Sequence, residues 1–317
     1  MMPPGFWMHD GVLPRLLAPA AAVVARGTAR RLARPGWRAP VPVLCCGNAG
    51  VGGAGKTTLA LDLLRRLQAR GVAAHCLTRG YGGRVRGVLR VDPSVHDAAL
   101  VGDEPLLLAA AAPTWVSADR AAGARAAVAA GAEALIMDDG LQNPTLVQDV
   151  GLLVIDGAAG FGNGRVMPAG PLREPVAAAA ARCRAAVLIG PDLAGARAAL
   201  PPGMPVLAAC LAPDMALHGR RVLAFAGIAR PAKFYATLRQ AGGTVVETMG
   251  FPDHHRFTCP ELTQMLRRAA ALDATPATTP KDAVRLPPAV RSAVLVVGVS
   301  LAWQDANEVE SVLGALS

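Results

Sequence analysis

The sequence predicts an α/β protein with a doubly wound, mostly parallel sheet, a second and smaller α/β unit, and an amphipathic helix ahead of both. Short apolar runs alternate with helical patterns along most of the 317 residues. The alternation stops at a Pro- and Gly-rich segment near residue 201 and then restarts. Because 52% of the residues are hydrophobic and 17% are charged, apolar surface is ample and a disordered chain is excluded.

The first expected element, within residues 1–40, is a basic helix. Six arginines and Asp10 give this segment a net charge of +5, within a total of +9. Apolar residues recur there at helical spacing, at Leu13, Leu16, Leu17, Ala20, Val23, Val24 and Gly27. Arg15, Arg26 and Arg30 fall on one face, opposite much of that stripe. The pattern is typical of a helix lying in a membrane surface, and equally of a helix that packs on a domain with a solvated Arg face.

The same segment predicts neither a membrane span nor a secretory signal. Its longest apolar run, residues 16–25, covers about ten residues, whereas a spanning helix needs about 20. Most of its positive charge follows that run, whereas a signal peptide carries its charge in front.

Two units follow this segment, a larger one at 41–212 and a smaller one at 213–317. Expected strands of the larger unit lie at 41–47, 73–78, 134–137, 150–155, 186–190 and 206–211, and expected helices at 56–70, 106–112 and 120–130. Expected strands of the smaller unit lie at 222–226, 244–248 and 293–299, and expected helices at 232–241 and 260–271. Residues 160–175 are a Gly/Pro-rich loop, and 274–288 are expected to be loop with a short helix.

The strongest motif is a phosphate-binding loop that follows the first expected strand and opens the first helix. It matches G-x-x-x-x-G-K-[ST], and the residues expected to cradle a nucleotide are Gly50, Val51, Gly52, Gly53, Ala54, Gly55, Lys56, Thr57 and Thr58. Glycines let backbone N–H groups point at phosphates, and the helix amino terminus adds positive charge. Lys56 would reach the β- and γ-phosphates, and the Thr57 hydroxyl would ligate Mg²⁺. The expected sheet is therefore of the P-loop NTPase type.

Two pairs of carboxylates are candidates for the remaining chemistry. Asp138 and Asp139 end a buried strand, where a P-loop protein needs a second Mg²⁺ anchor; a strand-end turn explains them too. Asp103 and Glu104 begin a helix, where an acidic residue is an ordinary N-cap. A carboxylate there is equally placed to accept a proton from an attacking hydroxyl.

Other polar residues leave alternatives open. His254 follows Asp253 in a loop of the smaller unit, where it is either exposed or available for catalysis. Tyr81 and Arg173 belong to Gly-rich loops that are either turns or phosphate contacts. The six cysteines form no CxxC pair and match no zinc pattern, which favours free thiols in a reducing cytosol.

Taken in order, the segments GNAGVGGAGKT, RGYGG, GDEP, ADR, DDGLQ, GFGNGRVMPAGPLREP and PDHH resemble the tetraacyldisaccharide 4'-kinase family, the lipid A kinases of Gram-negative bacteria. The resemblance covers residues 7 to about 301, and GFGNGR…PAGPLREP is its most specific part. It implies two α/β/α domains facing a cleft. It implies ATP-dependent phosphorylation of the 4'-hydroxyl of a lipid A disaccharide precursor at the cytoplasmic face of the inner membrane, by a peripheral or monotopic enzyme.

The resemblance also implies roles for particular residues. Asp103 would be the general base, assisted by His254, with Lys56 acting on the phosphates. The implied Mg²⁺ ligands are Thr57, Asp138, Asp139 and Glu104. Residues implied to position phosphate, metal or substrate are Tyr81, Arg120, Asn163, Arg173 and Glu174. The chain departs from the family at Asn143, where His is usual, and the acyl chains of the substrate are left open.

The implied cofactors are ATP and Mg²⁺, and the expected partners are a lipid disaccharide and an anionic membrane surface, for a protein acting as a monomer. Two rival hypotheses remain. One is a switch-type P-loop ATPase of the partition or metallochaperone kind, which would carry a second Lys where this chain has Val51. The other is a nucleic-acid-binding protein, suggested by the basic charge; no such motif is present, so no nucleic-acid partner is expected.

Overall fold

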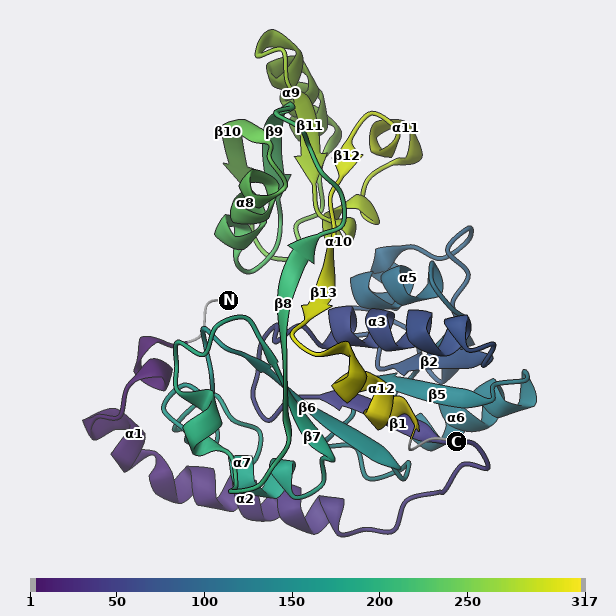
Figure 1. The fold of residues 1–317 in the computed structure, drawn as a ribbon, viewed down its shortest axis with the longest axis vertical. Helices are drawn as coiled ribbons and strands as arrows, with labels where there is room; N and C mark the ends of the chain where they lie inside the picture. Colours follow the sequence, from purple (N-terminus) through teal and green to yellow (C-terminus); the bar gives the residue numbers. More distant parts are fainter. Residues whose placement is uncertain (1–3, 315–317) are drawn as a thin grey trace.

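The structure, a computed structural model, describes residues 4–314. The outermost residues of the ranges 1–40 and 213–317 therefore lie outside the described residues. A nine-stranded sheet forms the larger domain and a four-stranded sheet forms the smaller one, which stands above it in Figure 1. These sheets confirm the predicted α/β class.

The larger sheet has the order β13-β8-β7-β6-β1-β5-β2-β4-β3. Its strands are β1 (Val43–Gly47), β2 (Ala74–Thr78), β3 (Val88–Arg90), β4 (Thr114–Ser117), β5 (Ala134–Asp138), β6 (Val150–Asp156), β7 (Ala185–Ile189), β8 (Val206–Pro213) and β13 (Val299–Trp303). All neighbours from β8 to β4 are parallel, and the edge strands β13 and β3 are antiparallel. The carboxyl ends of the parallel strands therefore meet along one edge, which is where α/β proteins bind ligands.

Helices cover both faces of this sheet. Because strand side chains alternate between faces, Leu44 and Cys46 of β1 point to one core and Val43 and Cys45 to the other. The first core includes residues of α3 (Lys56–Ala69), α5 (Asp103–Ala109) and α12 (Ala306–Gly314). The second includes residues of α2 (Ala18–Leu32), α6 (Arg120–Ala129) and α7 (Val176–Ala180). The shorter elements of this domain are η1 (Gly5–Met8), α1 (Val12–Leu16), α4 (Ala98–Val101) and η2 (Ala196–Ala199).

The smaller domain is an all-parallel sheet with the order β10-β9-β11-β12. Its strands are β9 (Arg221–Ala226), β10 (Thr244–Gly250), β11 (Thr275–Thr278) and β12 (Leu295–Val296). Its helices are α8 (Pro231–Gln240), α9 (Cys259–Ala271), α10 (Pro280–Ala283) and α11 (Pro288–Arg291). α8 packs on one face through Phe234 and Leu238, and α9 packs on the other through Leu262 and Met265.

The expected strand at 293–299 is reduced to the two residues of β12, and β13, which begins at its last residue, belongs to the other sheet. β12 pairs with β11 in the smaller sheet, whereas β13 pairs with β8 in the larger sheet. Between them the backbone N–H of Gly298 donates to Asp214 Oδ1 at 3.0 Å. A Cβ at Gly298 would lie 2.6 Å from the Asp214 carboxylate, so this close crossing requires glycine. β13 and α12 thus return the chain to the larger domain, which corrects the assignment of 299–314 to the smaller unit.

β8 and β13 form the antiparallel ribbon that joins the two domains, and it is visible in Figure 1 as the narrow connection between them.

β11 was not predicted from the sequence, because Pro276 interrupts a run of only four residues and Pro is unusual within a sheet. It is nonetheless an inner strand, paired with β9 on one side and β12 on the other.

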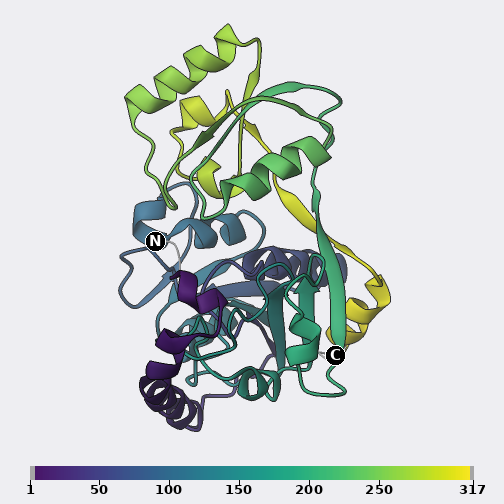
Figure 2. The same ribbon diagram turned by 90° about the vertical axis from the view of Figure 1, so that its left-hand side faces the viewer.

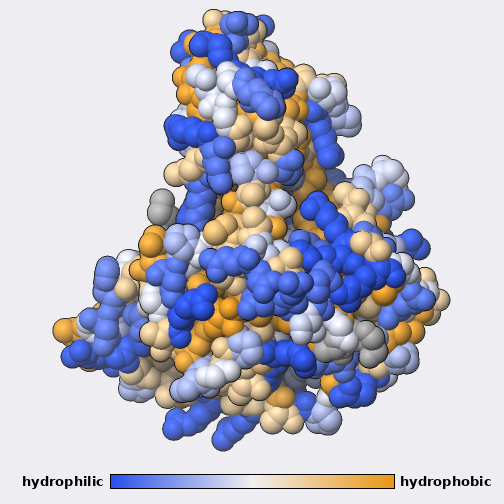
Figure 3. Space-filling view, viewed as in Figure 1, coloured by the Kyte–Doolittle hydropathy of each residue, from blue (hydrophilic) through white to orange (hydrophobic). Residues whose placement is uncertain are grey.

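The amino-terminal segment forms α1 and α2, which lie along the base of the larger domain, away from the smaller one (Figure 2). Ala21 of α2 is buried against the core. The apolar side chains of Val12, Leu16 and Val23 face outward and are 76%, 71% and 68% exposed. Figure 3 shows apolar side chains at the projecting corner where α1 lies. Within residues 4–314, no helix combines the length and the apolar character that crossing a bilayer requires.

Candidate active site

The phosphate-binding loop lies between β1 and α3, at the carboxyl edge of the larger sheet. Gly52 and Gly55 have φ angles of 114° and 92°, which L side chains rarely adopt. A Cβ at Gly55 would also lie 2.6 Å from the Ile189 side chain. Lys56 begins α3, and its Nζ atom lies 3.3 Å from Asn48 Oδ1 and 3.4 Å from the Gly52 carbonyl oxygen. The lysine side chain therefore folds back over the loop, where a phosphate chain would lie.

Asp138 ends β5 directly beside the start of this loop, because its Cα pairs with that of Cys46 in β1. The Thr57 hydroxyl donates to Asp138 Oδ2 at 2.9 Å. The other oxygen, Oδ1, is buried and has no hydrogen-bond partner among the described residues. Burial raises the pKa of Asp138 to about 6, although Lys56 and the Thr57 hydroxyl pull it down. One acceptor oxygen of this carboxylate is therefore unused, and burial disfavours its negative charge.

Asp139 is engaged differently from its neighbour. Its φ angle is 55°, which turns its side chain out of the strand direction. Arg173 donates to both carboxylate oxygens, at 2.8 and 3.2 Å, and Lys56 Nζ lies 3.6 Å from Oδ2. Burial alone would raise the pKa of Asp139, but Lys56 and Arg173 outweigh it and hold the pKa below its usual range. Asp139 is therefore a paired anion that holds two cations at the loop.

The second part of the site is formed by both domains together. Asp103 lies at the start of α5 in the larger domain, and His254 lies in the loop between β10 and α9 of the smaller domain. His254 Nδ1 is 2.6 Å from Asp103 Oδ2, and the Tyr81 ring centroid is 6.3 Å from that of His254. Burial raises the pKa of Asp103, but hydrogen bonds from His254 and Arg285 outweigh it, so the pKa lies below its ordinary value. Asp103 is thus a buried but ionised carboxylate.

Glu104 and Lys281 make a second contact between the domains. Lys281 Nζ lies 2.8 Å from Glu104 Oε1. The other oxygen, Oε2, is buried without a hydrogen-bond partner in residues 4–314, and the charge of Glu104 contributes to the raised pKa of Asp138. Glu104 thus lies near enough to Asp138 for its charge to be felt there.

Three residues predicted to position phosphate, metal or substrate make hydrogen bonds within the protein, although Arg120 Nε is buried without a partner among the described residues. Arg120 is buried and donates to the carbonyl oxygens of Ser117 and Asp139. Glu174 is buried and accepts hydrogen bonds from Gln142 and Arg182.

The third of these residues, Asn163, donates to the carbonyl oxygens of Phe6 and Ala169. It joins the amino-terminal segment to the loop at 160–175. Asn143, which stands where the family usually has His, closes a local turn by accepting from the N–H and hydroxyl of Thr145.

Sequence reasoning missed several groups that complete the site. Arg285 and Lys281 of the smaller domain contact Asp103 and Glu104. Gln142 contacts both Arg173 and Glu174. A signal for Lys281 was present, because the chain has only three lysines, Lys56, Lys233 and Lys281. Arg285 had no such signal, because it lies in a segment that was expected to be mostly loop.

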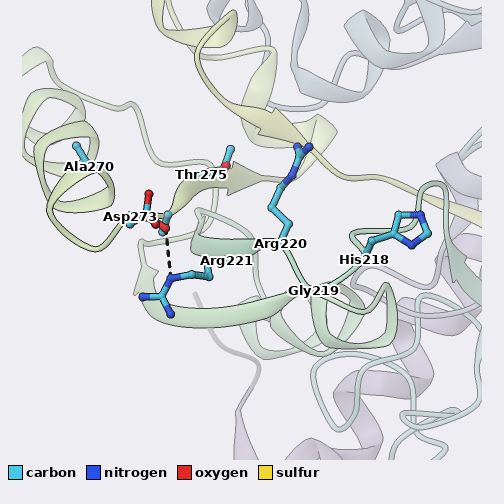
Figure 4. A pocket seen from close by; sticks show the side chains of 8 residues that line it. His218, Gly219, Arg220, Arg221, Ala270, Asp273 and Thr275 are labelled. Atoms are coloured by element: carbon cyan, nitrogen blue, oxygen red, sulfur yellow. Dashed lines mark hydrogen bonds between the residues drawn. The ribbon is translucent and has the colours of Figure 1, made fainter.

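A pocket of about 490 Å³ lies elsewhere, at the other end of the smaller sheet (Figure 4). Its lining includes His218, Arg220, Arg221 and Asp273. The Arg221 side chain is engaged there with the carbonyl oxygens of Leu272 and Asp273. None of the predicted site residues lines this pocket, so its size does not identify the active site.

Comparison with known proteins gives a consistent result. The family model described as tetraacyldisaccharide-1-P 4'-kinase matches residues 13–316. A tetraacyldisaccharide 4'-kinase of Gluconacetobacter diazotrophicus is 61% identical over 99% of this chain and 97% of its own length. One of Rhodospirillum centenum is 54% identical over 100% of this chain and 97% of its own length.

Among solved structures, a crystal structure of LpxK from Aquifex aeolicus in complex with ATP matches with a TM-score of 0.75 and 25% identity. The match covers 96% of this chain and 99% of that chain. The likeness therefore extends over both domains and not only over the phosphate-binding loop.

Proposed function

The chain belongs to the tetraacyldisaccharide 4'-kinase family, and from that membership we infer that it transfers phosphate from ATP to the 4'-hydroxyl of tetraacyldisaccharide 1-phosphate in lipid A biosynthesis. One observation of the structure carries this inference. The chain holds a P-loop lysine and also a buried carboxylate that contacts an imidazole of the other domain. A switch-type ATPase without lipid kinase activity finds no support in the comparisons.

For the nucleotide, we propose that residues 50–58 hold the phosphates of ATP. The left-handed glycines and the amino terminus of α3 support this role, because both direct N–H groups at an anion. Lys56 already lies over the loop and would exchange its contacts with Asn48 and Gly52 for phosphate oxygens. Its pairing with Asp139 keeps the ammonium group in place until the nucleotide arrives.

The residues present fit a Mg²⁺ ion. Two buried carboxylate oxygens, Asp138 Oδ1 and Glu104 Oε2, are without partners among the described residues, and both are the hard oxygen ligands that Mg²⁺ prefers. Residues 4–314 contain no group of three His, Cys, Asp or Glu side chains that would hold a metal unaided. We propose that Asp138 and Thr57 hold the ion together with phosphate oxygens, with Glu104 beside them. Bound Mg²⁺ supplies positive charge to the transferring phosphoryl group.

Asp139 is better suited to hold Lys56 and Arg173 than to bind metal, because both cations already occupy its oxygens. Arg173 would then lie beside the transferring phosphate, where a guanidinium group stabilises developing negative charge. Arg120 would act on Asp139 through its backbone, and Glu174 would act through Gln142, which contacts Arg173. Both are positioning residues in this proposal.

For the proton, we propose that Asp103 is the general base and His254 its partner. Oδ2 of Asp103 accepts from both His254 and Arg285, whereas Oδ1 accepts only from Arg285 among the described residues. A carboxylate oxygen has two lone pairs, so Oδ1 keeps one for the proton of the attacking hydroxyl. His254 would orient Asp103 through its Nδ1–H group, and the exposed Tyr81 beside it is placed to contact the sugar.

For the lipid, we propose that α1 and α2 lie in the cytoplasmic surface of the inner membrane. The outward-facing apolar side chains of Val12, Leu16 and Val23 and the arginines of the same segment support this placement. Asn163 would link this segment to the substrate loop through Phe6. One chain supplies the loop, the carboxylates and the base, so the enzyme is proposed to act as a monomer.

The test is a transfer assay. The purified protein is incubated with γ-labelled ATP, Mg²⁺ and tetraacyldisaccharide 1-phosphate in detergent micelles, and labelled lipid is separated from free phosphate. The expected product is a lipid that carries the label and does not form when the disaccharide is omitted. Release of labelled phosphate at the same rate with and without the lipid, and no labelled lipid, would instead indicate an ATPase.

A further inference from the structure

Arg285 is a buried cation at the junction of the two domains. It follows α10 in the smaller domain, and its side chain is 5% exposed. It donates to the Asp103 carboxylate through two nitrogens, Nε to Oδ1 at 2.8 Å and Nη2 to Oδ2 at 2.9 Å. Such a two-pronged contact fixes both the distance and the plane of a carboxylate, which a single hydrogen bond does not.

The third nitrogen of the same side chain contacts the smaller domain. Nη1 donates to the carbonyl oxygens of Gly227 and His255 at 3.3 and 3.2 Å, and to Asp282 Oδ1 at 3.1 Å. The carbonyl of His255 belongs to the loop that carries His254. One guanidinium group therefore holds Asp103 and the loop of its imidazole partner at the same time.

The groups around Asp103 come from several elements. The loop between β10 and α9 contributes His254, whose Nε2 lies 3.8 Å from Asp253. The segment around α10 contributes Arg285 and the fully buried Asp282. On its own helix Asp103 is followed by Glu104, which pairs with Lys281. Arg285 is the one cation among these that touches both oxygens of Asp103.

We propose that Arg285 is a positioning residue for phosphoryl transfer, which completes the base only when the smaller domain is docked on the larger one. This inference rests on the proposed role of Asp103. Without the fork, only the single contact from His254 remains, which does not fix the plane of the Asp103 carboxylate or the direction of its free lone pair. With the fork in place, docking of the smaller domain orients the Asp103 carboxylate. The same contact offsets part of the free-energy cost of burying its negative charge.

A purely structural role makes a different prediction. Asp156 of the larger domain pairs with Arg230 and Lys233 of the smaller domain, at 2.7 and 2.8 Å. This is a further ionic contact across the same junction, and it does not touch Asp103. If Arg285 only holds the domains together, its loss and the loss of Arg230 differ only in how far they lower stability, because Arg285 is buried and Arg230 is half-exposed.

The experiment compares Arg285→Gln, Arg285→Lys and the matched control Arg230→Gln by kcat, the KM for the lipid, the Kd for ATP and the thermal midpoint. Arg285→Gln loses the two-pronged contact that orients Asp103, so kcat is expected to fall by about 10- to 100-fold while the Kd for ATP stays unchanged. Arg285→Lys keeps the charge and loses the fork, so it also lowers kcat. Arg230→Gln is expected to leave kcat unchanged.

An unchanged kcat in Arg285→Gln, or an equal loss of kcat in Arg230→Gln, would overturn the proposal. If Arg285→Gln does not fold, Arg285→Lys decides: wild-type kcat refutes the need for the fork, and reduced kcat at unchanged Kd for ATP supports it. Asp103→Asn is measured in parallel. Turnover in Asp103→Asn would refute the base itself, whereas an inactive Asp103→Asn with a normal Arg285→Gln would refute only the role of Arg285.

Discussion

Nδ1 of His254 lies 2.6 Å from Oδ2 of Asp103, although the two residues are 151 positions apart and belong to domains with separate sheets. The contact exists only in the docked arrangement of the two domains. We propose Asp103 as the base, and its contact with a residue of the other domain makes the reactive arrangement depend on domain docking, which would limit transfer of phosphate to water.

Lys56→Met is expected to lower kcat by about 10²- to 10³-fold, the usual effect of removing one preorganised group that stabilises transition-state charge. The Kd for ATP should rise as well, because Asp139 would then face the phosphates without its lysine partner. Steady-state transfer assays and ATP titrations measure both. Lys233→Met, which removes a lysine away from the loop, is the matched control; an equal loss in both variants would show that the effect is not specific to the loop.

The protein should bind Mg²⁺ more weakly in acid than in neutral solution. Burial raises the pKa of Asp138 to about 6, so its carboxyl becomes protonated as the pH falls through 6 and loses the charge that attracts a cation. The apparent Kd for Mg²⁺ in the presence of ATP should then rise up to about tenfold per pH unit below 6. Titrations between pH 5 and 8 measure this. Asp138→Asn should bind Mg²⁺ weakly at every pH, and a pH dependence that survives in this variant would assign it to another group.

Asp138→Asn should also stabilise the fold at neutral pH. The folded pKa of about 6 exceeds the unfolded value of 3.8, so ionisation of Asp138 opposes folding; the penalty is absent below pH 3.8 and full above pH 6. The difference of about two units corresponds to about 3 kcal/mol at most. We expect the free energy of unfolding to rise by about 1–3 kcal/mol at pH 7.5, with a smaller gain at pH 5.

The neighbouring residue supplies the control for that measurement. The pKa of Asp139 is lowered because Lys56 and Arg173 outweigh its burial, so its ionised form favours folding above the ordinary carboxyl pKa, and the contribution is lost as the pH falls through the lowered value. Asp139→Asn should therefore destabilise the protein at pH 7.5. Urea unfolding at both pH values measures the free energy of unfolding of the two variants. A change of the same sign in both at pH 7.5 would contradict the different environments of the two carboxylates.

Binding to anionic vesicles should depend on the exposed arginines of α2. Each basic residue near such a surface contributes about 1 kcal/mol, so the double change Arg26→Ala with Arg30→Ala should weaken binding about 30-fold at low salt. Co-sedimentation with vesicles of phosphatidylethanolamine and phosphatidylglycerol measures this. The matched control is Arg239→Ala with Arg267→Ala, two exposed arginines of the smaller domain. Equal weakening by both pairs would indicate a general charge effect and remove α2 as the membrane contact.

The phosphate-binding loop was predictable from sequence because its chemistry is local. The glycines, Lys56 and Thr57 follow one another between a strand and a helix, so spacing alone specifies the geometry. Asp138 was predictable as a strand-end carboxylate next to it. Spacing did not show that Asp138 and Asp139 have different roles, since that depends on Arg173 and Lys56 approaching from outside the strand.

The contacts between the domains were beyond sequence reasoning. Arg285 lies in no motif, and only the folded structure shows that it reaches Asp103, 182 positions away. The pairing of Asp103 with His254 was likewise expected only from the resemblance to a family and not from spacing. β13 was misassigned for a related reason: an apolar run predicts a strand, but it does not tell which of two sheets the strand joins.

The most direct test of the account is the turnover of Asp103→Asn, measured as labelled lipid formed from γ-labelled ATP and tetraacyldisaccharide 1-phosphate, together with its Kd for ATP. Asn keeps the size of the side chain and cannot accept the hydroxyl proton as a base. The account predicts that kcat falls by at least about 10²-fold, as for other general bases, while ATP still binds as in the wild type. Turnover within a few-fold of the wild type would contradict it.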